Sequence, residues 1–251
     1  MKIVVIGGTG LIGSKVVRKL SEHGHDAVPA SPASGVNTLT GEGLKEVLQD
    51  AQVVVDVSNS PSFADDDVMA FFRTATGNLV EAGRESGLGH YVALSVVGSD
   101  RLPEAGYLRA KVVQEDLIKE SGIPFSIVRA TQFLEFVGGI ADSATEGNTV
   151  RLPDAGVQPI AAEEVATVVA RTAAAEPRNG TIEIAGPEVF TMDEWIREGL
   201  AFRQDPREVV TDPEARYFGA QPGKDGLLPG PGAELAKTRL ADWLPANPPV
   251  G

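Results

Sequence analysis

The chain has 251 residues, 42% of them hydrophobic and 23% charged, which is enough to bury the core of one large α/β domain or of a domain with an added lobe. Its formal net charge of −13 repels nucleic-acid phosphates and anionic membrane surfaces, so neither is expected as a partner. The absence of cysteine excludes disulfides, thiolate metal sites and thiol catalysis, and the three histidines, His23, His25 and His90, are too scattered for a metal cluster. Any redox chemistry is therefore expected to come from a bound cofactor.

The first apolar run, Ile3–Ile6, is four residues long and ends at a glycine. This is too short for the hydrophobic region of a signal sequence or for a membrane span. We therefore expect a cytoplasmic protein. The sequence leaves open whether it is a monomer or a homodimer.

Short β-branched runs follow one another along the first half of the chain, with helical patterns between them. The runs are Ile3–Ile6, Asp26–Val28, Val53–Val55, Tyr91–Leu94 and Phe125–Val128, and helical spacing appears over Leu11–Leu20, Val68–Val80 and Val112–Ile118. Runs that are apolar at successive positions suit strands covered on both faces. The alternation predicts an α/β fold of the Rossmann type, a doubly wound parallel sheet with helices on both sides.

After about residue 147 the regular alternation ends. Short strands are expected at Thr149–Leu152, Val157–Ile160 and Thr181–Ala185, and helices at Ala162–Ala174 and after the capping-box pattern Thr191-Met192-Asp193-Glu194. Beyond Asp205 prolines and glycines multiply, which favours loops. We therefore expect residues 1–150 to form a Rossmann domain and residues 151–251 to form a smaller α+β lobe that packs on it and is not an independent domain.

A glycine-rich turn, Gly7-Gly8-Thr9-Gly10-Leu11-Ile12-Gly13, joins the first strand to the first helix. The G-x-x-G-x-x-G spacing lets backbone N–H groups at a helix N-terminus approach a pyrophosphate, and a side chain at Gly10 would block that approach. The strand before the turn and the helix after it predict a nicotinamide dinucleotide site made by Gly7, Thr9, Gly10, Leu11, Ile12 and Gly13. The alternative is a tight turn built from small residues.

The loop after the second strand, Ala30-Ser31-Pro32-Ala33-Ser34-Gly35, is expected to meet the adenosine end of the dinucleotide. It has neither the acidic residue that holds the ribose 2′-hydroxyl of NAD nor the arginine typical of NADP sites. Because no carboxylate there repels a 2′-phosphate, and Ser31 and Ser34 can donate to one, we expect NADP(H) to be favoured over NAD(H), with Ser31 as a contact. The alternative is that both serines form a polar turn.

Tyr107 and Lys111 stand four residues apart at the start of a helical segment, so their side chains share one face. The segment follows a strand ending in Ala93-Leu94-Ser95, and ligands of open parallel sheets lie outside the carboxyl ends of the strands. A free phenol with a pKa of about 10 is a poor acid–base group at neutral pH, whereas a nearby ammonium group stabilises its phenolate. The pair is therefore a candidate for proton transfer.

With these motifs in this order, the chain resembles the atypical, NmrA-like members of the short-chain dehydrogenase/reductase superfamily. The likeness rests on the glycine turn, Val55-Asp56-Val57-Ser58-Asn59, Leu94-Ser95-Val96-Val97-Gly98, the Tyr107 and Lys111 pair, and Arg129-Ala130-Thr131-Gln132-Phe133. The resemblance implies that Tyr107 exchanges a proton with a substrate carbonyl. It implies that Lys111 lowers the pKa of this tyrosine and binds the nicotinamide ribose, and that Ser95, or else Ser99, orients the carbonyl.

The resemblance also implies cofactor contacts from Val57, Ser58 and Asn59 on the ribose and adenine side, and from Thr131 and Phe133 beside the nicotinamide. For several residues a structural role is the alternative: Thr131 and Gln132 as satisfied loop polar groups, Phe133 and Phe136 as core, and Arg129 as the partner of an acidic neighbour. The later aromatic residues either wall an apolar pocket or form the core of the lobe; they are Phe190, Trp195, Phe202, Tyr217, Phe218 and Trp243.

Three functional hypotheses follow. The first is an NAD(P)H-dependent oxidoreductase that transfers a hydride to or from a small carbonyl, quinone or sugar-like substrate. The second is a redox-sensing regulator that binds the dinucleotide without turning it over, and the third is an epimerase or dehydratase that uses the cofactor catalytically. Because Ser95, Tyr107 and Lys111 are all present, the sequence favours the oxidoreductase.

Overall fold

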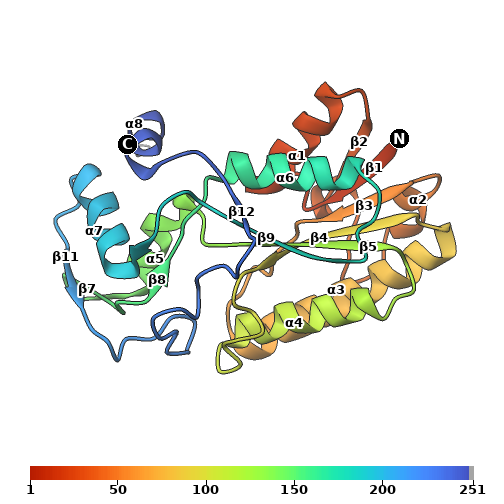
Figure 1. The fold of residues 1–251 in the computed structure, drawn as a ribbon. Helices are drawn as coiled ribbons and strands as arrows, with labels where there is room; N and C mark the ends of the chain where they lie inside the picture. The colour runs from red at the N-terminus through yellow and green to blue at the C-terminus, as the bar shows by residue number, and fades with distance from the viewer. Residues whose placement is uncertain (249–251) are drawn as a thin grey trace.

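A computed structural model describes residues 1–248 of the chain. Its centre is a seven-stranded sheet in which every neighbouring pair is parallel, in the order β12-β9-β5-β4-β3-β1-β2 (Figure 1). The strands are β1 (Lys2–Ile6), β2 (Asp26–Ala30), β3 (Val53–Asp56), β4 (His90–Val96), β5 (Phe125–Ala130), β9 (Gly180–Ala185) and β12 (Glu234–Leu235). The predicted Rossmann-type parallel sheet is confirmed, and each strand expected in the first half lies within an observed strand.

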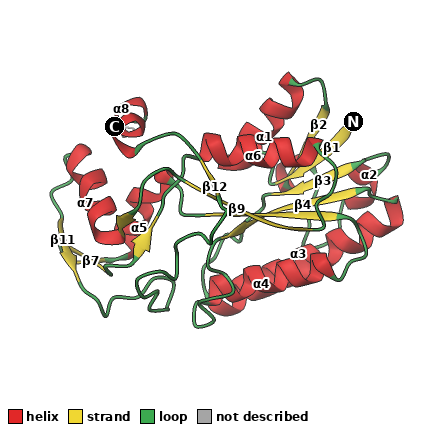
Figure 2. Cartoon of the chain, in the orientation of Figure 1, coloured by secondary structure: helices red, strands yellow, loops and turns green. Residues whose placement is uncertain are grey.

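Helices cover both faces of this sheet (Figure 2). On one face α1 (Leu11–Glu22) lies beside α6 (Ala162–Ala174), and the other face carries α2 (Leu44–Leu48), α3 (Asp65–Ser86) and α4 (Gly106–Lys119). Strand residues point to the two faces in turn. Ile3 and Val5 pack against α1 and α6, whereas Val4 and Ile6 pack toward α2 and α3. Burial on both faces is the reason why the strands are apolar at successive positions.

The order of the strands reverses at β1. β2 pairs with one side of β1 and β3 pairs with the other. In open α/β sheets this reversal marks the point where ligands bind, outside the carboxyl ends of the strands. The glycine turn, Ser31, Val57 and Thr131 each follow directly on the end of a strand of this sheet, namely β1, β2, β3 and β5. The sheet therefore brings segments far apart in the sequence to a single edge.

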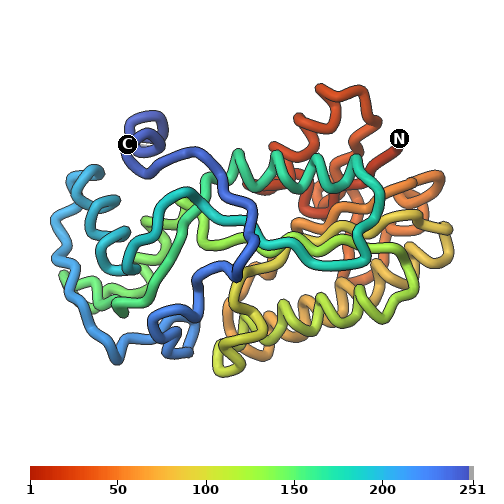
Figure 3. The backbone as a smooth tube through the Cα atoms, viewed as in Figure 1, coloured from red at the N-terminus to blue at the C-terminus, as the bar shows by residue number. Residues whose placement is uncertain are grey.

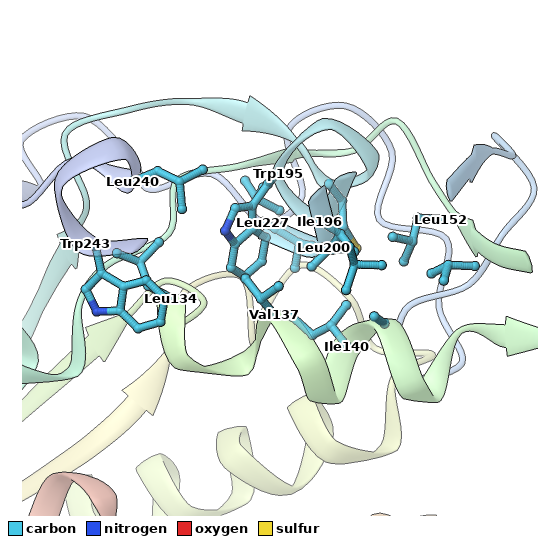
Figure 4. Packing of buried hydrophobic residues seen from close by; sticks show 14 of the residues in the cluster. Leu134, Val137, Ile140, Leu152, Trp195, Ile196, Leu200, Leu227, Leu240 and Trp243 are labelled. Carbon is cyan, nitrogen blue, oxygen red and sulfur yellow. The ribbon is translucent and has the colours of Figure 1, made fainter. Parts of the chain in front are cut away.

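A second hydrophobic core lies beside that edge. It is built on η2 (Leu134–Phe136), α5 (Val137–Ser143), β6 (Thr145–Glu146), β7 (Thr149–Leu152), β8 (Gly156–Val157), β10 (Phe190–Thr191), α7 (Met192–Phe202), β11 (Glu208–Thr211) and α8 (Leu240–Ala246). Figure 4 shows the indole of Trp195 among Leu134, Val137 and Ile196, with Trp243 nearby. The two tryptophans therefore belong to the core of the lobe, and the capping box expected at Thr191 begins α7.

The chain after residue 150 contributes to both cores. The lobe has β7, α7 and α8, whereas α6 covers the sheet beside α1, β9 pairs with β5, and β12 pairs with β9. Figure 3 shows the tube passing from the lobe to the sheet and back before α8. Glu164 holds the returning segment by accepting a hydrogen bond from the backbone N–H of Lys237 at 2.8 Å. The lobe is thus tied to the Rossmann layers at several points along the chain.

Candidate active site

The glycine turn leaves β1 and enters α1 with little room for side chains. A Cβ atom at Gly13 would lie 2.1 Å from the carbonyl oxygen of Gly7, and one at Gly8 would lie 2.7 Å from that of Val5. Gly10 is different, since its Cβ would meet only the Gly7 oxygen, at 3.3 Å. Gly10 is also the N-cap of α1 and supplies no side-chain cap, so the first N–H groups of the helix are left for a ligand.

The residues of this turn that are predicted to contact the cofactor fall into an exposed group and a buried group. Thr9, Gly10 and Leu11 lie on the surface at the start of α1, whereas Ile12 and Gly13 are buried beneath them. Ile12 packs in the hydrophobic core between the sheet and α1. The exposed part of the turn therefore offers backbone to an anionic group, and the buried part fixes how the helix leaves the sheet.

Ser31 follows β2 and is 7% exposed. Its hydroxyl caps the short helix η1 (Pro32–Ser34) at the Ser34 N–H, but it donates to no acceptor among residues 1–248. Ser34 differs, because its hydroxyl donates to the backbone oxygen of Ser31 and accepts from the Ser31 N–H, both at 2.9 Å. A buried hydroxyl whose hydrogen has no protein acceptor can donate to a ribose 2′-substituent, and Ser31 fits such a group.

The segment after β3 lies against the glycine turn. A Cβ atom at Gly7 would come within 3.0 Å of the backbone of Ser58, so the two loops pack closely. Ser58 donates its hydroxyl to the carboxylate of Asp56 at 2.6 Å, and Val57 packs against the core on the α1 side. Asn59 is exposed, and its side-chain oxygen accepts a hydrogen bond from the hydroxyl of Tyr107 at 3.1 Å. Asn59 thereby links the predicted cofactor side to the predicted catalytic residue.

Tyr107 lies in the first turn of α4 inside a group of aromatic rings. Its ring centroid is 5.2 Å from that of Phe218, 5.6 Å from that of Phe63 and 6.1 Å from that of Phe72. Burial among these rings raises the pKa of the Tyr107 phenol. This direction is opposite to the lowering that the resemblance implied, so the phenol stays protonated at neutral pH.

Lys111 is buried one helical turn further along α4. Its ammonium donates to the carbonyl oxygen of Leu94 at 2.8 Å and to Gln114, and lies 4.3 Å from the centre of the Phe72 ring. Burial lowers the pKa of Lys111 to about 8, although Asp56 and Glu115 act in the opposite direction. Phe72 therefore contacts both members of the predicted catalytic pair.

Behind Lys111 lies a polar chain that the sequence reasoning did not single out. Gln114 donates to the carboxylate of Asp56 at 2.9 Å, and the same carboxylate accepts the hydroxyl of Tyr91 at 3.1 Å. A signal was available, because Gln114 stands three residues after Lys111 on the same helix face and Asp56 is the single charged residue of β3. The chain connects the ammonium to a buried negative charge through one amide.

Ser95 lies near the end of β4 and points toward α4, the helix that also carries Tyr107 and Lys111. Its hydroxyl donates to the carboxylate of Glu115 at 2.7 Å, which also accepts two hydrogen bonds from Arg129, each of 2.8 Å. Burial raises the pKa of Glu115, but Arg129 and Ser95 outweigh it and hold that pKa below its usual range. It is the next residue, Val96, that packs with Tyr107 around the core of the lobe. The structure therefore does not bring Ser95 to the Tyr107 hydroxyl.

The fallback residue, Ser99, is also engaged, since its hydroxyl donates to the carbonyl oxygen of Val96 at 2.6 Å. After β5, Thr131 donates its hydroxyl to the carbonyl oxygen of Gln158 at 2.6 Å. Phe133 stacks on Phe136 with ring centroids 5.1 Å apart and packs against the α1 side of the core. Gln132, between Thr131 and Phe133, lies beside the hydroxyl of Tyr217 and lowers its pKa.

A protein-family model described as NAD(P)H-binding matches residues 7–176, which is more than half of the chain. The chain belongs to this NAD(P)H-binding family. The matched residues begin at the glycine turn and include β2 to β5 and the segment that follows each strand. The resemblance to NAD(P)-binding proteins of the short-chain dehydrogenase/reductase type is confirmed at this level.

Curated relatives are similar to the NAD(P)H-binding chain over most of its length but only part of their own. A chloroplastic divinyl chlorophyllide a 8-vinyl-reductase from Cucumis sativus is 27% identical over 223 residues, 74% of this chain and 52% of the relative. A photosystem II assembly factor, Ycf39, from Cyanophora paradoxa is 24% identical over 165 residues, 60% of this chain and 51% of the relative. The chain thus spans about half the length of these relatives.

Solved structures of low sequence identity share the fold. A dTDP-4-dehydrorhamnose reductase from Bacillus anthracis in complex with NADP has a TM-score of 0.69 at 15% identity, over 86% of this chain and 88% of that one. An NADPH-dependent quinone oxidoreductase from Escherichia coli complexed with NADPH has a TM-score of 0.65 at 19% identity, over 84% and 77%. Within residues 1–248, no helix combines the length and apolar character that a membrane crossing needs. The expected cytoplasmic location stays a prediction, since one relative is chloroplastic.

Proposed function

We propose that the protein is an NAD(P)H-dependent oxidoreductase that transfers a hydride between the nicotinamide and a small carbonyl, quinone or sugar-like substrate. One observation carries this proposal. The buried ammonium of Lys111 and the phenol of Tyr107, one helical turn apart, both contact the ring of Phe72. The phenol also donates a hydrogen bond to Asn59, in the loop that packs on the glycine turn. This arrangement supports a proton-transfer pair beside the proposed dinucleotide site.

The dinucleotide would be held by residues from four segments. The open N–H groups of α1 suit the pyrophosphate and Ser31 suits the 2′-phosphate of NADP(H). Val57 and Ser58, which lie against the glycine turn, are proposed to border the ribose and adenine. Thr131 and Phe133 are proposed to border the nicotinamide. When bound, the nicotinamide supplies the hydride that adds to the substrate carbon, or accepts it in the reverse reaction.

Tyr107 is proposed to donate its proton to the substrate oxygen as the hydride reaches the carbon, which leaves an alcohol and the oxidised dinucleotide. A phenol whose pKa is raised by burial stays protonated, and so the site favours the direction of reduction. The resulting phenolate requires compensation, which Lys111 can supply as a cation. For Ser95 to orient the substrate carbonyl, its hydrogen bond to Glu115 must open on substrate binding.

Calorimetric titration with NADPH, NADH and both oxidised forms, at fixed salt, tests dinucleotide binding. A screen of carbonyl and quinone compounds, followed by nicotinamide absorbance, then tests turnover. We expect NADPH to bind and at least one compound to be reduced, and we expect Tyr107→Phe to lose about a hundredfold or more in rate at unchanged NADPH affinity. Failure of every dinucleotide to bind would overturn the proposal.

Dinucleotide sensing without turnover is a second candidate, because Phe218 covers one face of the proposed proton donor. This hypothesis predicts that NADPH binds, that no compound in the screen oxidises it, and that Tyr107→Phe keeps the NADPH affinity of the wild type. The third hypothesis, cofactor use within an epimerase or dehydratase cycle, predicts conversion of substrate without net oxidation of NADPH. The same two experiments, with product analysis added, distinguish all three.

A further inference from the structure

Gln132 is 5% exposed, and neither its amide nitrogen nor its amide oxygen forms a hydrogen bond of normal geometry within the part of the chain that the structure describes. Its backbone is fixed, because its carbonyl oxygen accepts the N–H of Ile160 at 2.8 Å. Buried polar atoms without partners each cost about 1–3 kcal/mol, and almost all such atoms in folded proteins are paired. A buried amide that meets the Tyr217 hydroxyl but forms no hydrogen bond of normal geometry is open to a further polar partner.

The position of Gln132 brings it to the proposed catalytic tyrosine. It follows β5, whose last residue, Ala130, is paired in the sheet with Val96 at the end of β4. Val96, Tyr107 and Tyr217 pack against the same hydrophobic core. Burial raises the pKa of the Tyr217 hydroxyl, the Tyr107 phenol raises it further, and Gln132 lowers it from the other side. The Tyr217 hydroxyl is therefore a neighbour of both the amide and the phenol.

The surroundings favour a flat molecule without charge. Tyr107 is stacked on Phe218, and Phe218 meets Tyr217 edge-on with centroids 4.7 Å apart. Arginines of the nearby segments already donate to protein acceptors: Arg109 to Asp65, Arg129 to Glu115, and Arg216 to the carbonyl oxygen of Gly219. The ammonium of Lys111 likewise already donates hydrogen bonds to the carbonyl oxygen of Leu94 and to the side chain of Gln114. Aromatic faces and one free amide bind a planar, neutral ligand better than a phosphorylated one.

The end of β4 cannot supply the second polar contact, because Ser95 is bonded to Glu115 and the residue beside Tyr107 is Val96. We infer that Gln132 is a substrate-binding residue, and that the site takes an uncharged aromatic carbonyl compound with a ring hydroxyl, the carbonyl at Tyr107 and the hydroxyl at Gln132. An amide offers both a donor and an acceptor, which a hydroxyl satisfies at once. This inference rests on the proposed function, since it places the carbonyl at Tyr107.

Acetophenone and its meta- and para-hydroxy derivatives are suitable probes, because they differ only in the hydroxyl. Each is titrated by calorimetry into the wild-type protein and into Gln132→Leu, with and without saturating NADPH. We expect one hydroxylated probe to bind the wild type about tenfold more tightly than acetophenone, and the advantage to vanish in Gln132→Leu, which corresponds to one hydrogen bond. The exposed Gln49→Leu variant is the matched control and keeps the advantage.

Gln132→Leu removes two unpaired polar atoms, so we expect its melting temperature to stay at or above that of the wild type. Tyr217→Phe is a second variant, expected to weaken the same probe while acetophenone binds as before. The inference is overturned if no probe binds, if all three bind equally, or if the hydroxyl advantage persists in Gln132→Leu. Failure of NADPH alone to bind would overturn the proposed function instead, since the probes are also titrated without it.

Discussion

The ring of Phe218 lies on the ring of Tyr107, with centroids 5.2 Å apart and planes inclined by 24°. Phe218 is held in a tight turn in which Tyr217 and Ala220 exchange backbone hydrogen bonds of 2.8 and 3.1 Å. Its φ angle is +48°, a left-handed conformation that is costly for a bulky side chain, and Gly219 follows at +83°. A strained turn thus covers the proposed proton donor, and such strain gathers at functional sites.

Replacing Phe218 by glycine relieves the φ strain and uncovers Tyr107. Since burial is what raises the pKa of this phenol, exposing it lowers that pKa toward the ordinary value. Titration of tyrosinate absorbance measures the shift, and Tyr107→Phe identifies which of the three tyrosines is responsible. A Tyr107 component that titrates identically in Phe218→Gly and wild type would contradict this account.

Two glycines of the turn separate cofactor binding from folding. A Cβ at Gly13 would lie 2.1 Å from the Gly7 oxygen, so Gly13→Ala is expected to lose about 2 kcal/mol or more of stability. A Cβ at Gly10 would lie 3.3 Å from that oxygen, which a small shift relieves. Gly10→Ala should therefore melt within a few degrees of the wild type yet bind NADPH at least about tenfold more weakly, because the methyl group occupies the anion's approach.

Calorimetry and thermal melting check this pair of expectations. Gly77→Ala, in an open part of α3, is the matched control: it should keep NADPH affinity and melt at or above the wild-type temperature. If Gly10→Ala bound NADPH normally, the turn would not be the pyrophosphate site.

Ser31 is expected to decide the choice of dinucleotide. Ser31→Asp places a carboxylate where a 2′-phosphate would lie and offers an acceptor to a 2′-hydroxyl. NADPH affinity should fall about tenfold or more while NADH affinity is kept or improved. The control is Ser31→Asn, which has the shape of aspartate without its charge and should lose less NADPH affinity than Ser31→Asp. Equal affinity of the wild type for NADH and NADPH would remove the basis for this prediction.

The charge of Lys111 should set the upper limit of the pH range of activity. Burial lowers the pKa of Lys111 to about 8, so the ammonium is present below that pH and is lost as the pH rises through it. Rates of NADPH oxidation are therefore expected to fall above about pH 8. Gln114→Leu removes an acceptor of the ammonium, which disfavours the charged form and moves the decline to lower pH.

A pH–rate profile of wild type and Gln114→Leu measures this effect. Lys119→Gln, on the same helix but paired with Glu115 and Asp116, serves as the control and should leave the profile in place. If the rate fell at the same pH in Gln114→Leu as in the wild type, Gln114 would not stabilise the charged form of Lys111.

Much of the fold could be predicted from local patterns. The run Val53–Val55 is apolar at successive positions because both faces of β3 are covered. The capping box at Thr191 is read from four adjacent residues. That β9 and β12 join the central sheet could not be predicted in this way, because strand pairing brings together residues far apart in the chain. For β12 the strand is only two residues long.

Local patterns were enough to predict the glycine turn between strand and helix, the shared helix face of Tyr107 and Lys111, and the parallel sheet, because each depends on neighbours along the chain. Tertiary packing set three other features: Ser95 faces Glu115, Phe218 covers Tyr107, and the buried amide of Gln132 lacks a hydrogen bond of normal geometry within residues 1–248. A strand end has two faces, and which face a side chain takes depends on the helix and loop that pack there. Those neighbours come from segments that no local pattern brings together.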